Sequence, residues 1–250
     1  MRAQFTLTPS ESKRLIAKGV KALPSVQNAL KNHTIILAGG TTNGFLLEEL
    51  LGETLEEKSR YTVGIITEGK TGVSKEEKRI PPYVISKGKA LDKTFHWKDY
   101  LPQLERGDVF IKGGNAVDPT GLAAVLVSNS MAGTIGAALG PLYARGVELI
   151  VPIGLEKLIP DVRGAVEFLA SGLADEAIGD RVGLVPMLGA KVVTEITALE
   201  TLYRVTAKCI AAGGVGGSEG AVTLVIDGEA PEVEKALKDI KSFKGEPAVH

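Results

Sequence analysis

Three stretches of the chain place polar or charged residues directly after a short apolar run. The first is Gly39-Gly40-Thr41-Thr42-Asn43, which follows the apolar residues 34–38. Two glycines at a strand end let backbone N–H groups approach a ligand, and a helix that begins there adds unpaired N–H groups and a positive dipole end. A phosphate or carboxylate would fit this turn. The alternative is a plain tight turn in which Thr or Asn caps the helix.

The second stretch is Lys112-Gly113-Gly114-Asn115, which follows the apolar residues 109–111, with Asp118 three positions further on. Open α/β sheets bind ligands at the carboxyl ends of their strands, so these residues are candidates for a site. Lys112 could neutralise a bound anion, and Asp118 could orient a hydroxyl group or act as a base. The alternative is a surface lysine and an aspartate that starts a turn before Pro119.

The third stretch contains Glu156 and Lys157, just after the apolar residues 147–153. A carboxylate at this place could serve as general base or nucleophile. The alternative is an ion pair or a residue at a helix start. Asp118 and Glu156 are therefore the candidate catalytic residues. The glycine turns match neither the dinucleotide nor the P-loop pattern, so nucleotide chemistry does not follow from them.

The composition narrows the classes of function. One cysteine and three scattered histidines show no ligand spacing, so we expect no metal site, and no motif calls for a cofactor. The net charge of -1 gives no broad positive field for nucleic acid or a membrane surface. The N-terminal residues lack the apolar core of a secretory signal, and no apolar run reaches the ~20 residues of a membrane span. We expect a cytoplasmic protein.

Strand and helix patterns alternate over most of the chain, which predicts an α/β fold with a mainly parallel sheet and helices on both faces. Thr8, Pro9 and Glu11 form a capping-box pattern that starts the first helix. The Gly- and Ala-rich helix predicted for residues 133–144 could lie close to a second subunit, and we expect a homo-oligomer. Strands are expected at residues 34–38, 61–67, 83–86, 109–111, 122–127 and 147–153, and a long polar loop at residues 68–82.

The pattern changes near residue 184. We expect a main domain of residues 1–183, which binds the small molecule, and a small α/β appendage of residues 184–250. In the appendage, residues 191–197 and 221–226 predict strands, and residues 199–212 and 231–240 predict helices. Cys209 would then be an inert thiol on an apolar helix face, and the last nine residues would be frayed.

The ordered motifs resemble the NagB/RpiA/CoA-transferase-like superfamily, and within it the lactate-utilisation (LUD) domain family most closely. The turn Gly39-Gly40-Thr41-Thr42 is similar to a Gly-Gly-Ser-x-Thr turn of that family. The stretch Ala116-Val117-Asp118-Pro119-Thr120-Gly121 is similar to its Ala-x-Ala-Glu-Thr-Gly stretch, with Pro119 in place of the glutamate. Residues 154–160, GLEKLIP, are similar to its Gly-Ile-Glu-Lys-x-Val-Pro stretch. The likeness covers residues 34 to about 170. The appendage is loosely similar to the ferredoxin-like lid of some members.

The resemblance implies a role with small molecules of carbon metabolism. Our first hypothesis is a protein that binds a small anionic metabolite, a phosphosugar or carboxylate, at the strand ends, with isomerase- or transferase-type activity. Gly39 to Asn43 would hold the anion, and Lys112 with its neighbours Gly113, Gly114 and Asn115 would complete the site. The alternatives are a non-catalytic subunit of a lactate-type oxidation complex and a CoA-dependent transferase with Glu156 as nucleophile.

Overall fold

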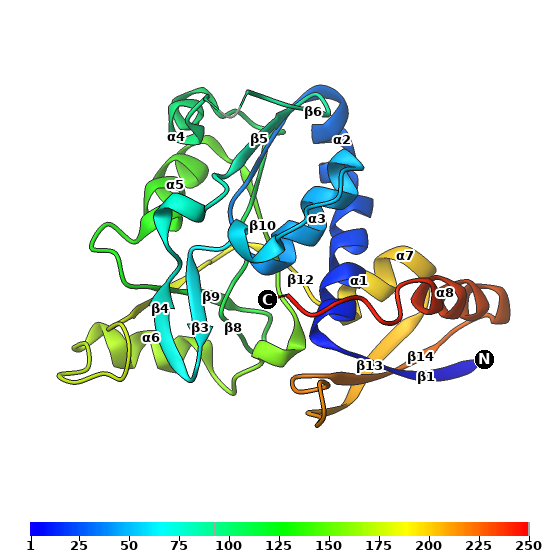
Figure 1. The fold of residues 1–250 in the computed structure, drawn as a ribbon. Helices are drawn as coiled ribbons and strands as arrows, with labels where there is room; N and C mark the ends of the chain where they lie inside the picture. Colours follow the sequence, from blue (N-terminus) through cyan, green and yellow to red (C-terminus); the bar gives the residue numbers. More distant parts are fainter. Residues whose placement is uncertain (93, 250) are drawn as a thin grey trace.

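A six-stranded sheet forms the centre of the molecule in the computed structural model, which describes residues 1–92 and 94–249 (Figure 1). Its strand order is β12-β10-β7-β2-β5-β6. Four neighbouring strands run parallel: β2 (Thr34–Leu37), β7 (Val109–Ile111), β10 (Glu148–Pro152) and β12 (Lys191–Val193). Two strands at one edge run antiparallel, β5 (Tyr83–Ser86) and β6 (Lys89–Ala90). The prediction of an α/β fold with parallel strands is confirmed at this level.

Helices cover both faces of this sheet because its strands are apolar on both sides. Ile35 and Leu37 of β2 pack in one buried cluster, whereas Ile36 packs in another on the opposite face, as the two-residue period of a strand requires. The first cluster includes residues of α1 (Pro9–Ala22), α2 (Pro24–Asn32) and α3 (Thr41–Leu51). The second includes residues of α4 (Trp97–Tyr100), the 3-10 turn η3 (Leu101–Gln103) and α5 (Gly133–Arg145).

The first helix begins as its sequence predicts. The backbone N–H of Thr8 donates to the carboxylate of Glu11 at 2.9 Å, and the N–H of Glu11 donates to the hydroxyl of Thr8 at 3.4 Å. This reciprocal pair is a capping box. Pro24 then starts α2 at once, so α1 and α2 form a bent pair over one sheet face.

The pattern at residues 61–82 was interpreted wrongly. Tyr61 is not the start of a strand: it ends the 3-10 helix η1 (Lys58–Tyr61), and its fully buried hydroxyl donates to the carbonyl of Leu37 at 2.5 Å. The chain then makes a hairpin of β3 (Gly64–Thr67) and β4 (Lys70–Val73), followed by the 3-10 turn η2 (Glu76–Lys78). The expected polar loop thus contains a strand. The sequence of β4, KTGV, has Val73 as its one apolar side chain besides glycine, and Val73 is half-exposed, so no alternating pattern marks the strand.

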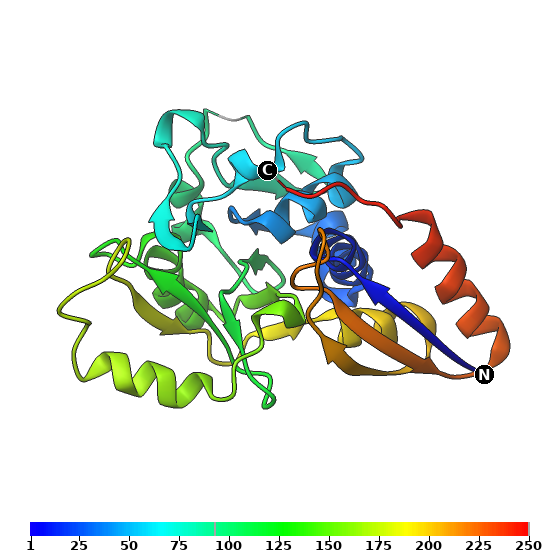
Figure 2. The same cartoon turned by 60° about the horizontal axis from the view of Figure 1, so that its bottom comes forward.

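A second, smaller sheet lies beyond the carboxyl ends of the parallel strands. It joins β8 (Ala116–Val117), β9 (Ala123–Val127) and β11 (Gly183–Pro186) in antiparallel pairs. The 3-10 turn η4 (Leu155–Lys157) and the helix α6 (Val162–Ala170) connect this part to β10. Figures 1 and 2 show α6 beside this sheet, away from α1 and α8.

A third sheet takes strands from both ends of the chain. β1 (Arg2–Leu7) pairs with β14 (Val222–Asp227), which pairs with β13 (Thr206–Ala212), all antiparallel. The helices α7 (Glu195–Tyr203) and α8 (Ala230–Ser242) accompany it (Figure 2). Because β1 belongs to this sheet and β12 to the central one, the predicted boundary between residues 183 and 184 does not coincide with a boundary between sheets. The two-domain division stays a prediction.

The helix expected at residues 199–212 was wrong in its second half. Arg204 adopts a left-handed conformation at the end of α7, with φ of 45°, and the chain continues as β13. Cys209 therefore lies on a strand and is partly exposed. The alternation of exposed and buried side chains is that of a strand: Ala207 is buried between the exposed Thr206 and Lys208.

The end of the chain is docked, not frayed. The ammonium group of Lys244 donates to the carboxylate of Glu11 at 2.6 Å, and the carboxylate of Glu246 accepts from Arg14 at 3.0 Å. In Figure 1 the segment after α8 runs back toward α1 and α3. Among the described residues, no helix combines the length and apolar character that a membrane span needs.

Candidate functional site

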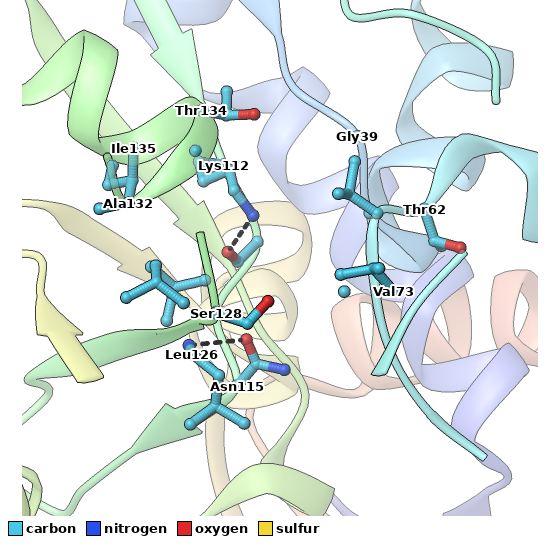
Figure 3. A pocket seen from close by; sticks show the side chains of 18 of the residues that line it. Gly39, Thr62, Val73, Lys112, Asn115, Leu126, Ser128, Ala132, Thr134 and Ile135 are labelled. Atoms are coloured by element: carbon cyan, nitrogen blue, oxygen red, sulfur yellow. Dashed lines mark hydrogen bonds between the residues drawn. The ribbon is translucent and has the colours of Figure 1, made fainter. Parts of the chain in front are cut away.

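A pocket opens at the carboxyl ends of β2 and β7, with a volume of about 170 Å³. It lies between the central sheet, the β3–β4 hairpin and β9 (Figure 3). The residues that line it come from six places along the chain: Gly39, Gly40, Thr41, Thr42; Thr62, Val63, Gly64, Val73; Lys112, Gly113, Gly114, Asn115; Val125, Leu126, Val127, Ser128, Asn129; Ala132, Gly133, Thr134, Ile135; and Lys157. Eight of the eleven site residues that the sequence suggested are among them.

The start of α3 forms one side of the pocket. The helix begins directly at Thr41, with Gly40 as its N-cap residue and no side-chain hydrogen bond at the cap. The first helical N–H groups therefore have no partner within the helix. Gly39 cannot carry a larger side chain without displacement, since a Cβ atom there would lie 3.1 Å from the carbonyl oxygen of Tyr61. The turn thus presents backbone donors at close range, as the sequence predicted.

The start of α5 forms the opposite side. Its N-cap residue is Ala132, in a left-handed conformation, and again no side chain caps the helix. Gly133, Thr134 and Ile135 of its first turn all line the pocket. Two uncapped helix N-termini therefore face one cavity, and each carries a partial positive charge. By contrast, side chains cap α1 and α6, through Thr8 and Asp161.

Two lysine side chains, those of Lys112 and Lys157, line the pocket. The ammonium of Lys112 donates to the carbonyl of Gly113 at 3.2 Å (Figure 3). The ammonium of Lys157 donates to the carbonyl of Gly114 at 3.0 Å. Among the described residues, neither lysine has a carboxylate within salt-bridge distance. Burial, and secondarily the positive charge of Lys157, lower the pKa of Lys112 to about 8. Burial also lowers the pKa of Lys157.

The rest of the lining is neutral. None of the described residues that line the pocket is Asp or Glu. Val63 and Val73 from the β3–β4 hairpin and Val125 and Val127 from β9 supply apolar surface, while Ser128 and Thr134 supply hydroxyl groups. The amide oxygen of Asn115 accepts from the N–H of Leu126 at 3.1 Å, which joins β9 to the Gly113-Gly114 turn. The arrangement can hold an anionic group in a largely apolar enclosure.

Asp118 does not line the pocket. Its buried carboxylate accepts hydrogen bonds from the backbone N–H groups of Thr120, Leu122 and Val162, and from the hydroxyl of Thr120 at 2.6 Å. The hydroxyl of Thr120, followed by the backbone donors, lowers the pKa of this carboxyl. Asp118 organises the turn between β8 and β9 and anchors the start of α6. The hydrogen bonds of its carboxylate are thus structural, since each one fixes a turn or a helix start.

Glu156 points away from the pocket, into a buried charge cluster. Its carboxylate accepts from Lys13 of α1 at 3.2 Å, and its second oxygen is buried without a hydrogen-bond partner among the described residues. Glu195 at the start of α7 accepts from the N–H of Leu155 at 2.9 Å. Burial, and secondarily the nearby charge of Glu156, raise the pKa of Glu195 to about 7. No local sequence pattern indicates that Glu195 joins this cluster.

Asn43 does not line the pocket but supports the strand ends beside it. Its fully buried amide nitrogen donates to the carbonyl of Ala38 at 2.7 Å, and it lies 3.5 Å from the carbonyl of Ile111. It thereby ties the ends of β2 and β7 together. The residues that sequence reasoning missed are chiefly Lys157 and the start of α5. The run Ser128-Asn129, followed by Gly133, repeats the strand–turn–helix pattern of Gly39 and could have revealed them.

Comparison with protein-family models, curated proteins and solved structures finds no match to this chain. The described residues contain no group of three or more His, Cys, Asp or Glu side chains that could hold a metal ion. The site therefore has to be interpreted from its own geometry.

Proposed function

We propose that this protein binds a small anionic metabolite, a phosphosugar or carboxylate, in the pocket at the ends of β2 and β7. One observation carries the proposal: the ammonium group of Lys112, which has no carboxylate within salt-bridge distance among the described residues, faces a cavity that also receives Lys157 and two uncapped helix N-termini. Lys112 is half-buried, and charges removed from water are normally paired. An anionic ligand would supply the missing partner.

The ligand would lie between the two helix starts, with its anionic group near Gly40 to Thr42 and the ammonium of Lys112. The apolar hairpin wall would exclude water and so strengthen these interactions. An isomerase- or transferase-type reaction of a phosphosugar or a small acid is compatible with this lining. The resemblance to the NagB/RpiA/CoA-transferase-like superfamily, and to the LUD family within it, supports the same class of ligand and belongs to the proposal.

The buried position of Glu156 speaks against the CoA-transferase alternative. A nucleophilic carboxylate must reach the substrate, but Glu156 is paired with Lys13 outside the pocket. The subunit alternative has one observation in its favour. Phe168 on α6 and Ile178 in the following loop are 78% and 81% exposed, and contact with a partner chain would bury them.

A thermal-shift screen tests the proposal. Phosphosugars, small carboxylates, CoA esters and nucleotides are each added to the wild type, to Lys112→Met, and to Lys208→Met as a matched control. Lys208 is an exposed lysine of β13, remote from the pocket. A ligand at ~100 times its Kd adds about 2.7 kcal/mol of stability, a shift of several degrees. A shift that Lys208→Met keeps and Lys112→Met loses supports the proposal. Equal shifts in all three proteins contradict it.

A further inference from the structure

The surroundings of Lys112 suit covalent chemistry as well as charge neutralisation. Its amino group points into the pocket toward the wall formed by Gly39 and Thr62 (Figure 3). Its one hydrogen bond within the described chain is donated to the carbonyl of Gly113. An amine that donates to a carbonyl keeps its lone pair free when it is deprotonated. The lone pair therefore remains available to a molecule in the cavity.

We infer that Lys112 forms an imine with a small carbonyl compound that carries a carboxylate or phosphate group. This inference rests on the proposed function, because the anion site would hold the charged end of that compound. The amine of Lys112 adds to the carbonyl carbon and gives a carbinolamine. Loss of one water molecule then leaves a C=N bond to Nζ. The step involves no oxidation or reduction and needs no other reactant.

Three features of the pocket favour the neutral amine that this step needs. Among the described residues, the lining holds no carboxylate that would stabilise the ammonium form. Lys157 lies close enough for its charge to act on Lys112. Burial is the largest effect, and together they lower the pKa of Lys112 to about 8. Near neutral pH the fraction of Lys112 in the neutral amine form is then roughly several hundred-fold larger than the same fraction for a free lysine. Desolvation and a neighbouring cation are the two known ways to activate a lysine nucleophile.

The pocket also contains groups that can move the protons of the reaction. The carbinolamine hydroxyl must be protonated to leave as water, and the hydroxyls of Ser128 and Thr134 and the ammonium of Lys157 line the same cavity. Lys157 is held by the carbonyl of Gly114 at 3.0 Å. Its charge would also stabilise the anionic end of the carbonyl compound. Lys112 is therefore assigned the covalent step, and Lys157 a positioning role.

Reductive trapping with glyoxylate tests the inference. Glyoxylate is an aldehyde with a carboxylate and is small enough for the cavity; acetaldehyde is the uncharged control. The full-length protein is treated briefly with each aldehyde and sodium cyanoborohydride, and modified lysines are located by peptide mass spectrometry. We expect Lys112 to be modified by glyoxylate about tenfold or more faster than Lys208, a preference that is smaller with acetaldehyde and that added sulfate removes.

Two variants separate this inference from the proposed function. Lys112→Arg keeps the positive charge but cannot form an imine, so it should still bind sulfate in calorimetry and give no fast modification. Lys208→Met should behave as the wild type. If the wild type binds sulfate but glyoxylate modifies surface lysines, or Lys157, ahead of Lys112, the imine inference is wrong and the anion site stands. If the wild type does not bind sulfate either, both fail.

Discussion

The protonation of Lys112 connects the chemistry of a single residue to ligand binding. Burial and the charge of Lys157 disfavour the ammonium form and bring the pKa of Lys112 close to neutral pH, to about 8. Below this pH Lys112 is a cation, and above it Lys112 is a neutral amine. The same side chain can therefore attract an anion in one state and attack a carbonyl carbon in the other.

Sulfate affinity should therefore fall as the pH rises through 8. Sulfate keeps its charge over this range, so the change reports on the protein. The bound anion stabilises the ammonium form and moves the fall to somewhat higher pH. Lys157, whose pKa is also lowered, would leave a weaker slope in Lys112→Met. That variant should bind sulfate roughly ten- to a hundredfold more weakly below pH 8. Calorimetry at pH 6.5 to 9.5 measures both effects. A flat wild-type profile would exclude Lys112 from the site.

Glu195 gives the protein a second pH dependence, this time of stability. Its pKa is raised from 4.5 to about 7 in the folded protein, so the folded state holds the proton more tightly than the unfolded state. The resulting stability is complete below pH 4.5 and is lost as the pH rises to about 7. The loss is roughly 3 kcal/mol.

Glu195→Gln should remove this component. Denaturant unfolding of both proteins from pH 4.5 to 8 gives the difference in unfolding free energy at each pH. The variant should gain on the wild type as the pH rises, and the difference should level off above pH 7. A difference that stays constant with pH would mean that Glu195 titrates normally. Glu156 and Lys157 face Glu195 from η4, and Lys13 of α1 pairs with Glu156.

Among the elements, the β3–β4 hairpin is the wall of the pocket that is least supported by the core. It belongs to none of the three larger sheets, and its side chains are mostly exposed. It is anchored at Thr71, whose carbonyl accepts from the N–H of Asp180 at 2.9 Å and whose hydroxyl donates to the carbonyl of Asp180 at 2.8 Å. The loop after α6 thus holds the hairpin in place at the pocket.

Gly179→Ala should loosen this anchor. Gly179 has φ of 96°, and an added Cβ atom would lie 2.4 Å from the carbonyl oxygen of Thr71, so the backbone contact must open. We expect a cost of about 1–3 kcal/mol, faster hydrogen exchange in β3 and β4, and weaker sulfate binding. Gly189→Ala is the control, because Gly189 has φ of 67° and open space around its Cβ position. Equal exchange in the hairpin of both variants would contradict the anchoring role.

The elements also explain how far sequence reasoning reaches. Helix α1 and strand β7 were predicted closely, since a capping box and a buried apolar run are local signals. The Gly39 and Lys112 turns line one pocket, because adjacent parallel strands end at the same sheet edge.

Lys157 was missed because it lies in the 3-10 turn η4 after β10, where sequence reasoning singled out its neighbour Glu156. The start of α5 was missed because it follows β9, and no local pattern specifies the position of the antiparallel sheet to which β9 belongs. The role of Asp118 was missed because its carboxylate accepts a hydrogen bond from Val162, a residue distant in the sequence.

In the whole molecule, Arg14 joins three segments that are far apart in the sequence. Its guanidinium donates to Glu48 at 2.6 Å and Glu49 at 3.1 Å in α3, and to Glu246 at 3.0 Å near the end of the chain. The Arg14 side chain is only 14% exposed. Removing Arg14 from this partly buried network leaves Glu246 without its ion-pair partner, whereas Glu48 keeps Lys58 at 2.8 Å. The docking of the C-terminal segment onto α1 and α3 therefore depends on this residue.

Arg14→Met should lower the unfolding free energy by roughly 2–4 kcal/mol. The matched control is Arg2→Met, because Arg2 also forms an ion pair, with Asp227 at 2.9 Å, but its side chain is 78% exposed. An exposed pair contributes about 0–1 kcal/mol. Denaturant unfolding of the three proteins measures the difference. Equal losses in the two variants would mean that the buried network does not hold the chain end in place.

A crystal structure of the wild type grown with sulfate would test the central claim, that the pocket is an anion site. The account predicts a sulfate ion between the start of α3 and the start of α5, within hydrogen-bond distance of the Lys112 ammonium and of backbone N–H groups at Thr41 or Thr42. The same ion should be missing in Lys112→Met crystals grown in parallel. Sulfate ions bound elsewhere, with this pocket filled by water alone, would contradict the account.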